Sequence, residues 1–274
     1  MKESRIDSIP DLIEVFNTLP NHFVFRGHAS SAWHLESTLE RVLGNILSDE
    51  SAKRFEEFAL LRFKSKFHLY DRENIKPETK LAWLSIMQHY GVPTRLLDFT
   101  ESPYVALYFA LEGYNPQSRD DFAIFSLDYK AIMTNSKTYI SSQDGDFKDQ
   151  FKDSYDQQDI MFERFVDKRA YDVVWIAEPS LLNVRLDRQA GSFLFACNRS
   201  RRIEDILELP IYCNVQMNKY IIANDLYEGL FVLLRKMNLT SKSLYGNLDG
   251  LAKSISMEMK VYAFEMSGKG DGGN

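Results

Sequence analysis

The chain has 274 residues, of which 33 are Lys or Arg and 39 are Asp or Glu, so that the formal net charge is −6. Hydrophobic residues make up 45% and aromatic residues 13%, which is enough apolar surface for a well-packed core and excludes intrinsic disorder for most of the chain. The acidic balance argues against a simple electrostatic nucleic-acid binder. It stays compatible with an enzyme that acts on nucleic acid through one local basic patch.

The sequence gives no sign of secretion or membrane insertion. The first residues are followed by no apolar run, so we expect no signal peptide. The longest apolar stretches, such as 104–111, are far shorter than the roughly 20 residues of a membrane-spanning helix. Two cysteines can form neither a disulfide framework nor a four-ligand zinc site. We therefore expect a soluble, cytoplasmic and reduced protein without membrane contact.

Hydrophobic periodicity predicts helices and strands in mixed order, without regular βαβ alternation. The expected helices cover 11–19, 41–70, 77–90, 103–112, 224–237 and 244–256. The expected strands cover 22–26, 96–99, 122–127, 172–177, 192–197, 211–215, 219–223 and 260–264. Since no repeat or linker interrupts the chain, we expect one α+β domain over 1–274, with a core from about 22 to 265 and mixed, mostly antiparallel sheets flanked by helices.

An Asp-rich stretch from about 141 to 160 differs in composition from its surroundings, because it has few aliphatic residues. This composition is typical of a solvated, mobile loop. The alternative is an insertion that faces a substrate or a partner.

Signatures of the common catalytic sites are absent from the sequence. It has no Gly-rich phosphate loop, no G-x-S-x-G elbow and no His at ligand spacing with Cys or Glu, so we expect no metal site. Cys197 and Cys213 occupy apolar strand patterns, which are typical of inert core thiols rather than of nucleophiles.

Three groups of polar residues stand where plain strands and turns are otherwise expected. Arg26 ends an apolar strand, where a guanidinium serves either a carboxylate bridge or the bidentate grip of a phosphate. In the segment 94–102, Ser102 either caps the next helix or belongs to a helix N-terminus that favours an anion. Arg185 and Gln189 precede a strand and form either a simple turn or one side of a binding site.

The blocks that contain these residues resemble the FRG domain family, named for its Phe-Arg-Gly motif. Residues 25–27 resemble the first block of that family, and 88–110 resemble the second, longer block closely. Residues 185–193 and 248–252 resemble weaker later blocks, so the resemblance spans 22 to about 256.

A more distant resemblance connects the chain to ADP-ribosyltransferases of the Arg/Ser/Glu type, which implies an ADP-ribosyltransferase-like fold with NAD as substrate. In that comparison Arg26 contacts the NAD phosphates and ribose, Thr100 and Ser102 support the nicotinamide-ribose pocket, and Gln189 holds a ribose hydroxyl. These four are the implied catalytic residues. The residues implied to contact NAD are Phe25, Arg26, Gly27, Gln88, His89, Thr94, Arg95, Asp98 and Arg185.

The sequence departs from the transferase pattern at its acidic position, because Gln189 stands where a Glu is expected. An amide can bond a ribose hydroxyl but brings no negative charge to a developing cation. Either Asp98 or Glu178 substitutes for the missing acid, or catalysis is weaker, or the site only binds NAD.

The resemblances imply an NAD-dependent mono-ADP-ribosyltransferase that acts as a bacterial toxin or antiphage effector, with an antitoxin or chaperone protein as partner. RNA is favoured as acceptor over DNA or protein, since Arg199, Arg201 and Arg202 follow a predicted strand and would steer a phosphate backbone. These arginines alternatively form a solvated turn that pairs with Glu204 and Asp205. Two further alternatives are a non-catalytic NAD- or nucleotide-binding module and an interaction subunit of a defence complex.

Overall fold

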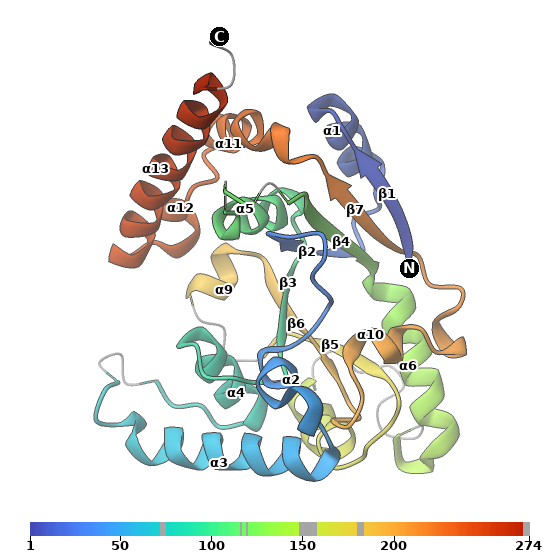
Figure 1. Ribbon diagram of the computed structural model, residues 1–274. Coiled ribbons are helices and arrows are strands. Elements are labelled where there is room, and N and C mark those ends of the chain that lie inside the picture. The colour runs from blue at the N-terminus through green and yellow to red at the C-terminus, as the bar shows by residue number, and fades with distance from the viewer. Residues whose placement is uncertain (72–74, 116, 119, 148–157, 180–183, 271–274) are drawn as a thin grey trace.

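A computed structural model describes residues 1–71, 75–115, 117–118, 120–147, 158–179 and 184–270 (Figure 1). Its described residues form one seven-stranded sheet in the order β1-β7-β4-β2-β3-β6-β5. Only β1 and β7 pair in parallel, so the predicted α+β class with a mostly antiparallel sheet is confirmed. The strands are β1 (Lys2–Ile6), β2 (Phe23–His28), β3 (Leu97–Thr100), β4 (Phe122–Asp128), β5 (Val174–Ala177), β6 (Gly191–Ala196) and β7 (Met217–Ile222).

Helices cover both faces of this sheet. They are α1 (Ile9–Thr18), α2 (Thr38–Leu43), α3 (Asp49–Phe67), α4 (Lys80–His89), α5 (Pro103–Gly113), α6 (Tyr129–Gln143), α8 (Gln158–Met161), α9 (Val184–Arg188), α10 (Ile203–Leu207), α11 (Tyr227–Lys236), α12 (Ser241–Tyr245) and α13 (Leu248–Gly270). None of the described helices is long and apolar enough to cross a membrane.

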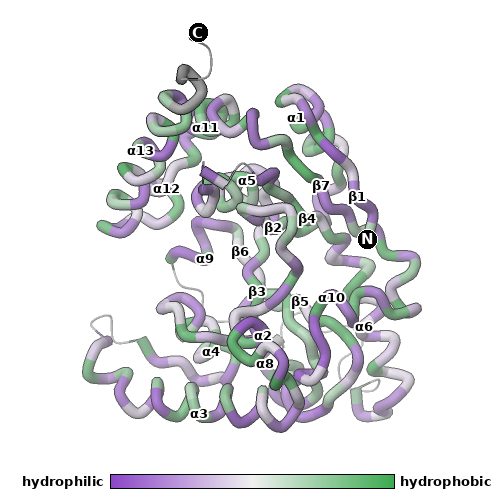
Figure 2. Tube along the Cα trace, viewed as in Figure 1, coloured by the Kyte–Doolittle hydropathy of each residue, from purple (hydrophilic) through white to green (hydrophobic). Residues whose placement is uncertain are grey.

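The sheet separates two hydrophobic cores, and the alternation along β2 shows the division. Phe23 and Phe25 enter the core shared with α1, α5, α11 and α13, whereas Val24 enters the core shared with α4, α6 and α10. This follows from the two-residue period of a strand, which points successive side chains to opposite faces. Figure 2 shows the hydrophobic segments gathered in the interior on both sides of the sheet.

The two halves of the sheet meet at a narrow joint between β2 and β3. Phe25 and Thr100 are the one residue pair in register between these strands, whereas β2 and β4 pair over six residues. Few backbone hydrogen bonds therefore join the two halves of the sheet. One half contains β1, β7, β4 and β2, and the other contains β3, β6 and β5. Other contacts have to hold this joint closed.

Several predicted elements differ from the structure. The helix expected over 41–70 is broken at Gly44, whose φ of 51° ends α2 before α3 begins. The strand expected over 260–264 lies inside α13, because Val261 packs into the core on a helical face. The strand expected over 211–215 is also wrong, since Pro210–Tyr212 forms a 3-10 turn and leaves Cys213 exposed. Strand β1 and helix α6 were not predicted.

The Asp-rich stretch is partly built into the fold. Residues 141–143 end α6 and 158–160 lie in α8, while 148–157 lie outside the described residues. Asp144 is buried and accepts a hydrogen bond of 3.2 Å from the hydroxyl of Tyr171. Asp159 is buried as well and accepts a hydrogen bond of 3.0 Å from the hydroxyl of Thr79.

Gly27 allows strand β2 to touch helix α5. A Cβ atom added at Gly27 would lie 1.9 Å from the carbonyl oxygen of Ala106 and 2.8 Å from the backbone nitrogen of Ala110. Both obstacles are backbone atoms of a helix, which cannot turn aside as a flexible side chain can. The glycine of the Phe-Arg-Gly motif is therefore required by packing.

We expect Gly27→Ala to destabilise the fold by about 1–3 kcal/mol or more, because the added methyl group forces β2 and α5 apart. Urea unfolding measures the change in the free energy of unfolding. Gly145→Ala is the matched control, since nothing lies within 4 Å of a Cβ added there. Equal stability of the two variants would contradict the close approach of β2 and α5.

Candidate functional site

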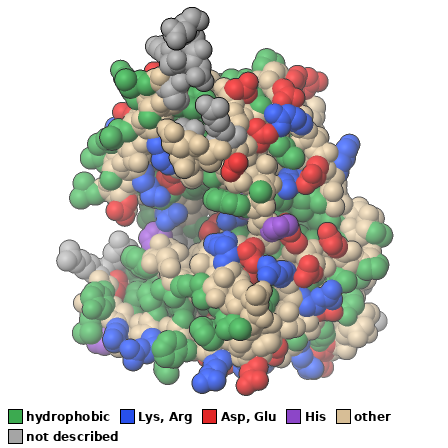
Figure 3. Space-filling model, in the orientation of Figure 1, with side chains coloured by type: hydrophobic (Ala, Val, Ile, Leu, Met, Phe, Trp, Pro, Cys, Tyr) green, Lys and Arg blue, Asp and Glu red, His purple; other side chains and the backbone are tan. Residues whose placement is uncertain are grey.

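A cavity of about 300 Å³ lies beside the joint between β2 and β3, where α5, α9, α12 and α13 approach the sheet. A smaller pocket of about 40 Å³ adjoins it and shares part of its wall. Figure 3 shows the surface hollowed between the α12–α13 region and the α3–α4 region, with Lys and Arg side chains gathered at the hollow. The charged residues that line the cavity are Arg26, Asp98, Glu112, Arg185 and Lys253.

Most residues implied by the transferase resemblance converge here from separate blocks of the sequence. Phe25, Arg26, Gly27, Asp98, Thr100, Arg185 and Gln189 line the cavity, and Gln88 and His89 line the smaller pocket. Thr94, Arg95 and Ser102 line neither of the two.

Arg26 bridges the two halves of the sheet. Its Nη1 donates a hydrogen bond of 2.7 Å to the carbonyl oxygen of Asp98 on β3, and its Nε donates one of 2.8 Å to Nε2 of His28. Burial and the charge of Arg26 lower the pKa of His28 to about 3, so that this ring is neutral and can accept. Burial lowers the pKa of Arg26 to about 10, which leaves the guanidinium charged at neutral pH. Its Nη2 has no partner among the described residues and remains available to a ligand.

A chain of hydrogen bonds orients Asp98. The hydroxyl of Thr94, a fully buried residue, donates to Oε1 of Gln88 at 2.7 Å, which fixes the orientation of that amide. Nε2 of Gln88 then donates to Oδ2 of Asp98 at 3.0 Å. Thr94 therefore acts through Gln88 and does not reach the cavity, while Gln88 connects the smaller pocket to the cavity.

Hydrogen bonds to backbone groups connect Thr100 with Gln189 and with Ser102. The hydroxyl of Thr100 donates to the carbonyl oxygen of Gln189 at 2.6 Å and accepts from the backbone N–H of Ser102 at 3.1 Å. The hydroxyl of Ser102 accepts from the backbone N–H of Val105 and so caps α5, which places its role in the helix and not in the cavity. Gln189 is 8% exposed and faces both pockets.

Arg185 brings an unneutralised positive charge to the cavity. Its guanidinium carbon lies 4.6 Å from the centre of the Tyr245 ring, and it forms no ion pair within the described part of the chain. A cation over an aromatic face is held by the ring quadrupole while its N–H groups stay available. Arg185 is thus positioned by Tyr245 and is still free to bind an anion.

Glu112 is the acidic residue that sequence reasoning missed. It ends α5, and its carboxylate accepts hydrogen bonds from Tyr108 at 2.8 Å, from Tyr245 at 2.7 Å and from Lys253 at 3.2 Å. Burial and the charge of Glu112 raise the pKa values of Tyr108 and Tyr245, so both hydroxyls stay protonated as donors. Glu178, which the sequence offered as a substitute acid, lines neither pocket.

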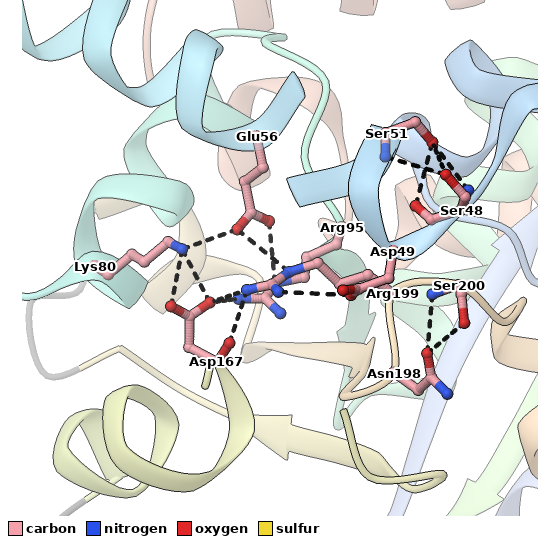
Figure 4. Close-up of polar contacts among 10 residues, drawn as sticks. All are labelled: Ser48, Asp49, Ser51, Glu56, Lys80, Arg95, Asp167, Asn198, Arg199 and Ser200. Atoms are coloured by element: carbon pink, nitrogen blue, oxygen red, sulfur yellow. Dashed lines mark hydrogen bonds and ion pairs between the residues drawn. The ribbon is translucent and has the colours of Figure 1, made fainter. Parts of the chain in front are cut away.

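Arg95 was predicted to contact NAD, but it does not line the cavity. It lies in a buried ion network (Figure 4). Its guanidinium pairs with Glu56 at 3.0 Å and also with Asp167, and Lys80 pairs with the same two carboxylates at 3.1 and 2.9 Å. Its guanidinium carbon also lies 4.9 Å from the ring centre of Phe162. Arg95 therefore ties α3, α4 and the segment before β3 together.

The predicted nucleic-acid patch is also neutralised within the protein. Arg199 is buried in the same network, where it pairs with Asp167. Arg201 pairs with Asp172 at 2.9 Å, and Arg202 pairs with Glu36. These partners differ from the Glu204 and Asp205 that the sequence suggested. Each of the three guanidiniums already has a carboxylate partner, which weakens the electrostatic argument for a phosphate-steering patch.

The ion network predicts a pH dependence of stability. Burial alone would raise the pKa of Asp167, but the charges of Arg95, Lys80 and Arg199 and a hydrogen bond from Lys80 outweigh it and lower the pKa to about 2. Because the folded-state pKa lies below the unfolded value of about 3.9, this contribution is present above about pH 4 and is lost as the pH falls towards 2.

We therefore expect the free energy of unfolding to fall by about 2 kcal/mol through Asp167 alone over that interval. Asp167→Asn should be less stable at neutral pH and should show a shallower loss in acid, measured by urea unfolding at a series of pH values. Asp172→Asn is the control, because Asp172 pairs with the more exposed Arg201. An acid profile of Asp167→Asn that matches wild type would contradict the role of the network.

The family model of the FRG domain matches residues 21–119, and the match includes β2, α4, β3 and α5. A search of curated proteins and a search of solved structures found no match. The likeness to ADP-ribosyltransferases thus gains no support from these comparisons, and the later blocks around 185–193 and 248–252 lie outside the family match. The matched segment contains the Phe-Arg-Gly strand and the whole second block, so residues 21–119 of this chain match the FRG domain.

Proposed function

We propose that the cavity binds NAD and that the protein transfers ADP-ribose from it to an acceptor. The observation that carries the proposal is the convergence of Arg26, Arg185 and Lys253 with the carboxylate of Glu112 in one cavity, although they come from four separate elements. A toxin or antiphage setting with an antitoxin partner follows from the resemblance alone and is proposed together with the activity.

The cavity offers what a dinucleotide requires. A diphosphate needs cationic donors. Nη2 of Arg26 and the guanidinium of Arg185, which have no carboxylate partner among the described residues, supply them on opposite sides of the joint. Flat rings need an apolar or aromatic wall, which Phe109 and Tyr245 provide. The volume of about 300 Å³ lies at the lower end of ligand pockets, and the adjoining pocket extends it past Gln88 and His89.

Glu112 has the properties of the missing acidic residue. A carboxylate can accept about four hydrogen bonds, and Tyr108, Tyr245 and Lys253 use three of them. The remaining acceptor site on Oε1 is available to a ribose hydroxyl. In ADP-ribosyl transfer the bond from ribose to nicotinamide breaks, nicotinamide leaves, and the acceptor atom bonds to the ribose and loses a proton. A fixed negative charge beside the ribose stabilises the positive charge that develops there.

A second candidate function is NAD binding without turnover. It is favoured by Gln189, which faces the cavity without a charge, and by the three hydrogen bonds that already hold Glu112 in place. Both candidates bind NAD. Only the transferase transfers label from NAD to an acceptor, because label transfer requires turnover.

Arg185→Ala is expected to weaken NAD binding about 10- to 100-fold, the loss that corresponds to one charge-assisted hydrogen bond. Isothermal titration calorimetry with NAD measures the change. Arg188→Ala is the control, since Arg188 belongs to the same helix but does not line the cavity. Wild type that fails to bind NAD, or an Arg185→Ala variant that binds it unchanged, would remove the cavity from the proposal.

Glu112→Gln separates catalysis from binding. Gln keeps one acceptor oxygen for the tyrosines but removes the charge, so we expect turnover to fall about 100- to 1,000-fold while NAD binding changes little. The readout is transfer of label from NAD to protein or nucleic acid, with thermal unfolding to confirm the fold. Glu101→Gln is the control, because this exposed acid does not line the cavity. Binding of NAD by wild type without any label transfer would support the non-catalytic candidate.

A further inference from the structure

Helix α3 presents an aromatic and basic face to solvent. Phe55, Phe58, Arg62 and Lys66 recur at spacings of three or four residues, so their side chains share one side of the helix. Phe55 is 44% exposed and Phe58 63% exposed, which is unusual for phenylalanine. Figure 3 shows hydrophobic and basic side chains interspersed over the α3 region.

The C-terminal half of this face opens into a groove of about 330 Å³. We call it the α3 groove, and its lining residues are Arg62, Phe63, Lys66, Phe67, Tyr70, Asp71 and Tyr90. Tyr70 and Tyr90 are 79% and 63% exposed, and the rings of Phe63 and Tyr90 lie 6.5 Å apart at 33°. The groove thus offers aromatic rings whose surfaces face solvent.

The cations of the α3 groove differ from the arginines of the buried ion network and of the segment 199–202. Arg95, Arg199, Arg201 and Arg202 are all neutralised by carboxylates. Arg62 and Lys66 in contrast are exposed and form no ion pair within the part of the chain that the structure describes. In a chain with a net charge of −6, two unpaired cations beside exposed rings mark a surface suited to an anionic, ring-bearing ligand.

The α3 groove lies next to the candidate site. The ring of Tyr90 contacts the ring of His89 at 4.8 Å, and His89 lines the small pocket that adjoins the cavity. The wall of the groove at Tyr90 is therefore one residue along the chain from the wall of the small pocket at His89.

We propose that the α3 groove binds single-stranded nucleic acid. Bases stack on the exposed rings of Tyr70 and Tyr90, as in stacking platforms of other single-strand binders, while Arg62 and Lys66 contact phosphates. Binding rests on the groove alone. The additional role of the strand as acceptor of ADP-ribose rests on the proposed function.

The test measures binding without NAD, so that its failure and the failure of the transferase proposal are distinguishable. Fluorescein-labelled oligouridylate RNA is titrated with the full chain, and fluorescence anisotropy is recorded over a range of salt concentrations. Tyr90→Ala and Tyr70→Ala should each weaken binding roughly 5- to 100-fold, as expected for the loss of one base–aromatic stack. The double variant Arg62→Ala/Lys66→Ala should weaken binding and lower the slope of log K against log salt by about 1.4, since each phosphate contact on a single strand contributes about 0.7.

The matched control is the double variant Arg201→Ala/Arg202→Ala, which removes two paired arginines and should leave binding unchanged. Thermal unfolding of all variants confirms the fold. Oligothymidylate DNA serves as a second probe, and binding of either single strand with these variant effects supports the groove. The proposal is overturned if neither strand binds, if the groove variants bind as wild type does, or if a duplex binds as tightly as the single strand. Binding of polyglutamate in place of both strands would assign the groove to an acidic protein and overturn it as well.

Discussion

The narrow joint between β2 and β3 is the constraint on which the rest of this site depends. Phe25 and Thr100 are the one pair in register there, whereas the strands on either side pair over longer ladders. Arg26 adds a hydrogen bond across the joint, from β2 to the carbonyl oxygen of Asp98 on β3. A side chain therefore supplies part of what a longer ladder would supply in an ordinary sheet, and the cavity lies where the ladder is short.

The sequence predicted the class of the fold and many of its elements for local reasons. Ser102 and Pro103 carry a helix start that depends only on neighbouring residues, and α5 begins there. Predictions failed where packing overrides propensity. Residues 260–264 combine β-branched and aromatic side chains, but Val261 is buried on a face of α13. Gly44 ended a helix that periodicity alone would continue.

The candidate site was predicted in part, and the reasons differ by residue. Arg26 stood out because a guanidinium at the end of an apolar strand is unusual, Arg185 stood out because it precedes a strand, and both line the cavity. Arg95 stood in an equally suggestive block, but its partners Glu56 and Asp167 lie far away in the sequence, so no local pattern could show that it was already paired. Glu112 was not predicted as a site residue, because no local sequence pattern marked it. It lies in the last turn of the apolar helix α5, and only the fold brings Tyr245 and Lys253 to it.

The joint also has a mechanical consequence. Arg26, Glu112 and Lys253 belong to one half of the molecule, whereas Asp98, Arg185 and Gln189 belong to the other, and all six face the cavity. A ligand that contacts both groups connects the two halves across the joint. Its binding free energy opposes separation of the halves and adds to the free energy of unfolding of the whole domain. Occupancy would then stiffen the molecule as a whole, and amide hydrogens on β5, remote from the cavity, would exchange more slowly when the ligand is bound.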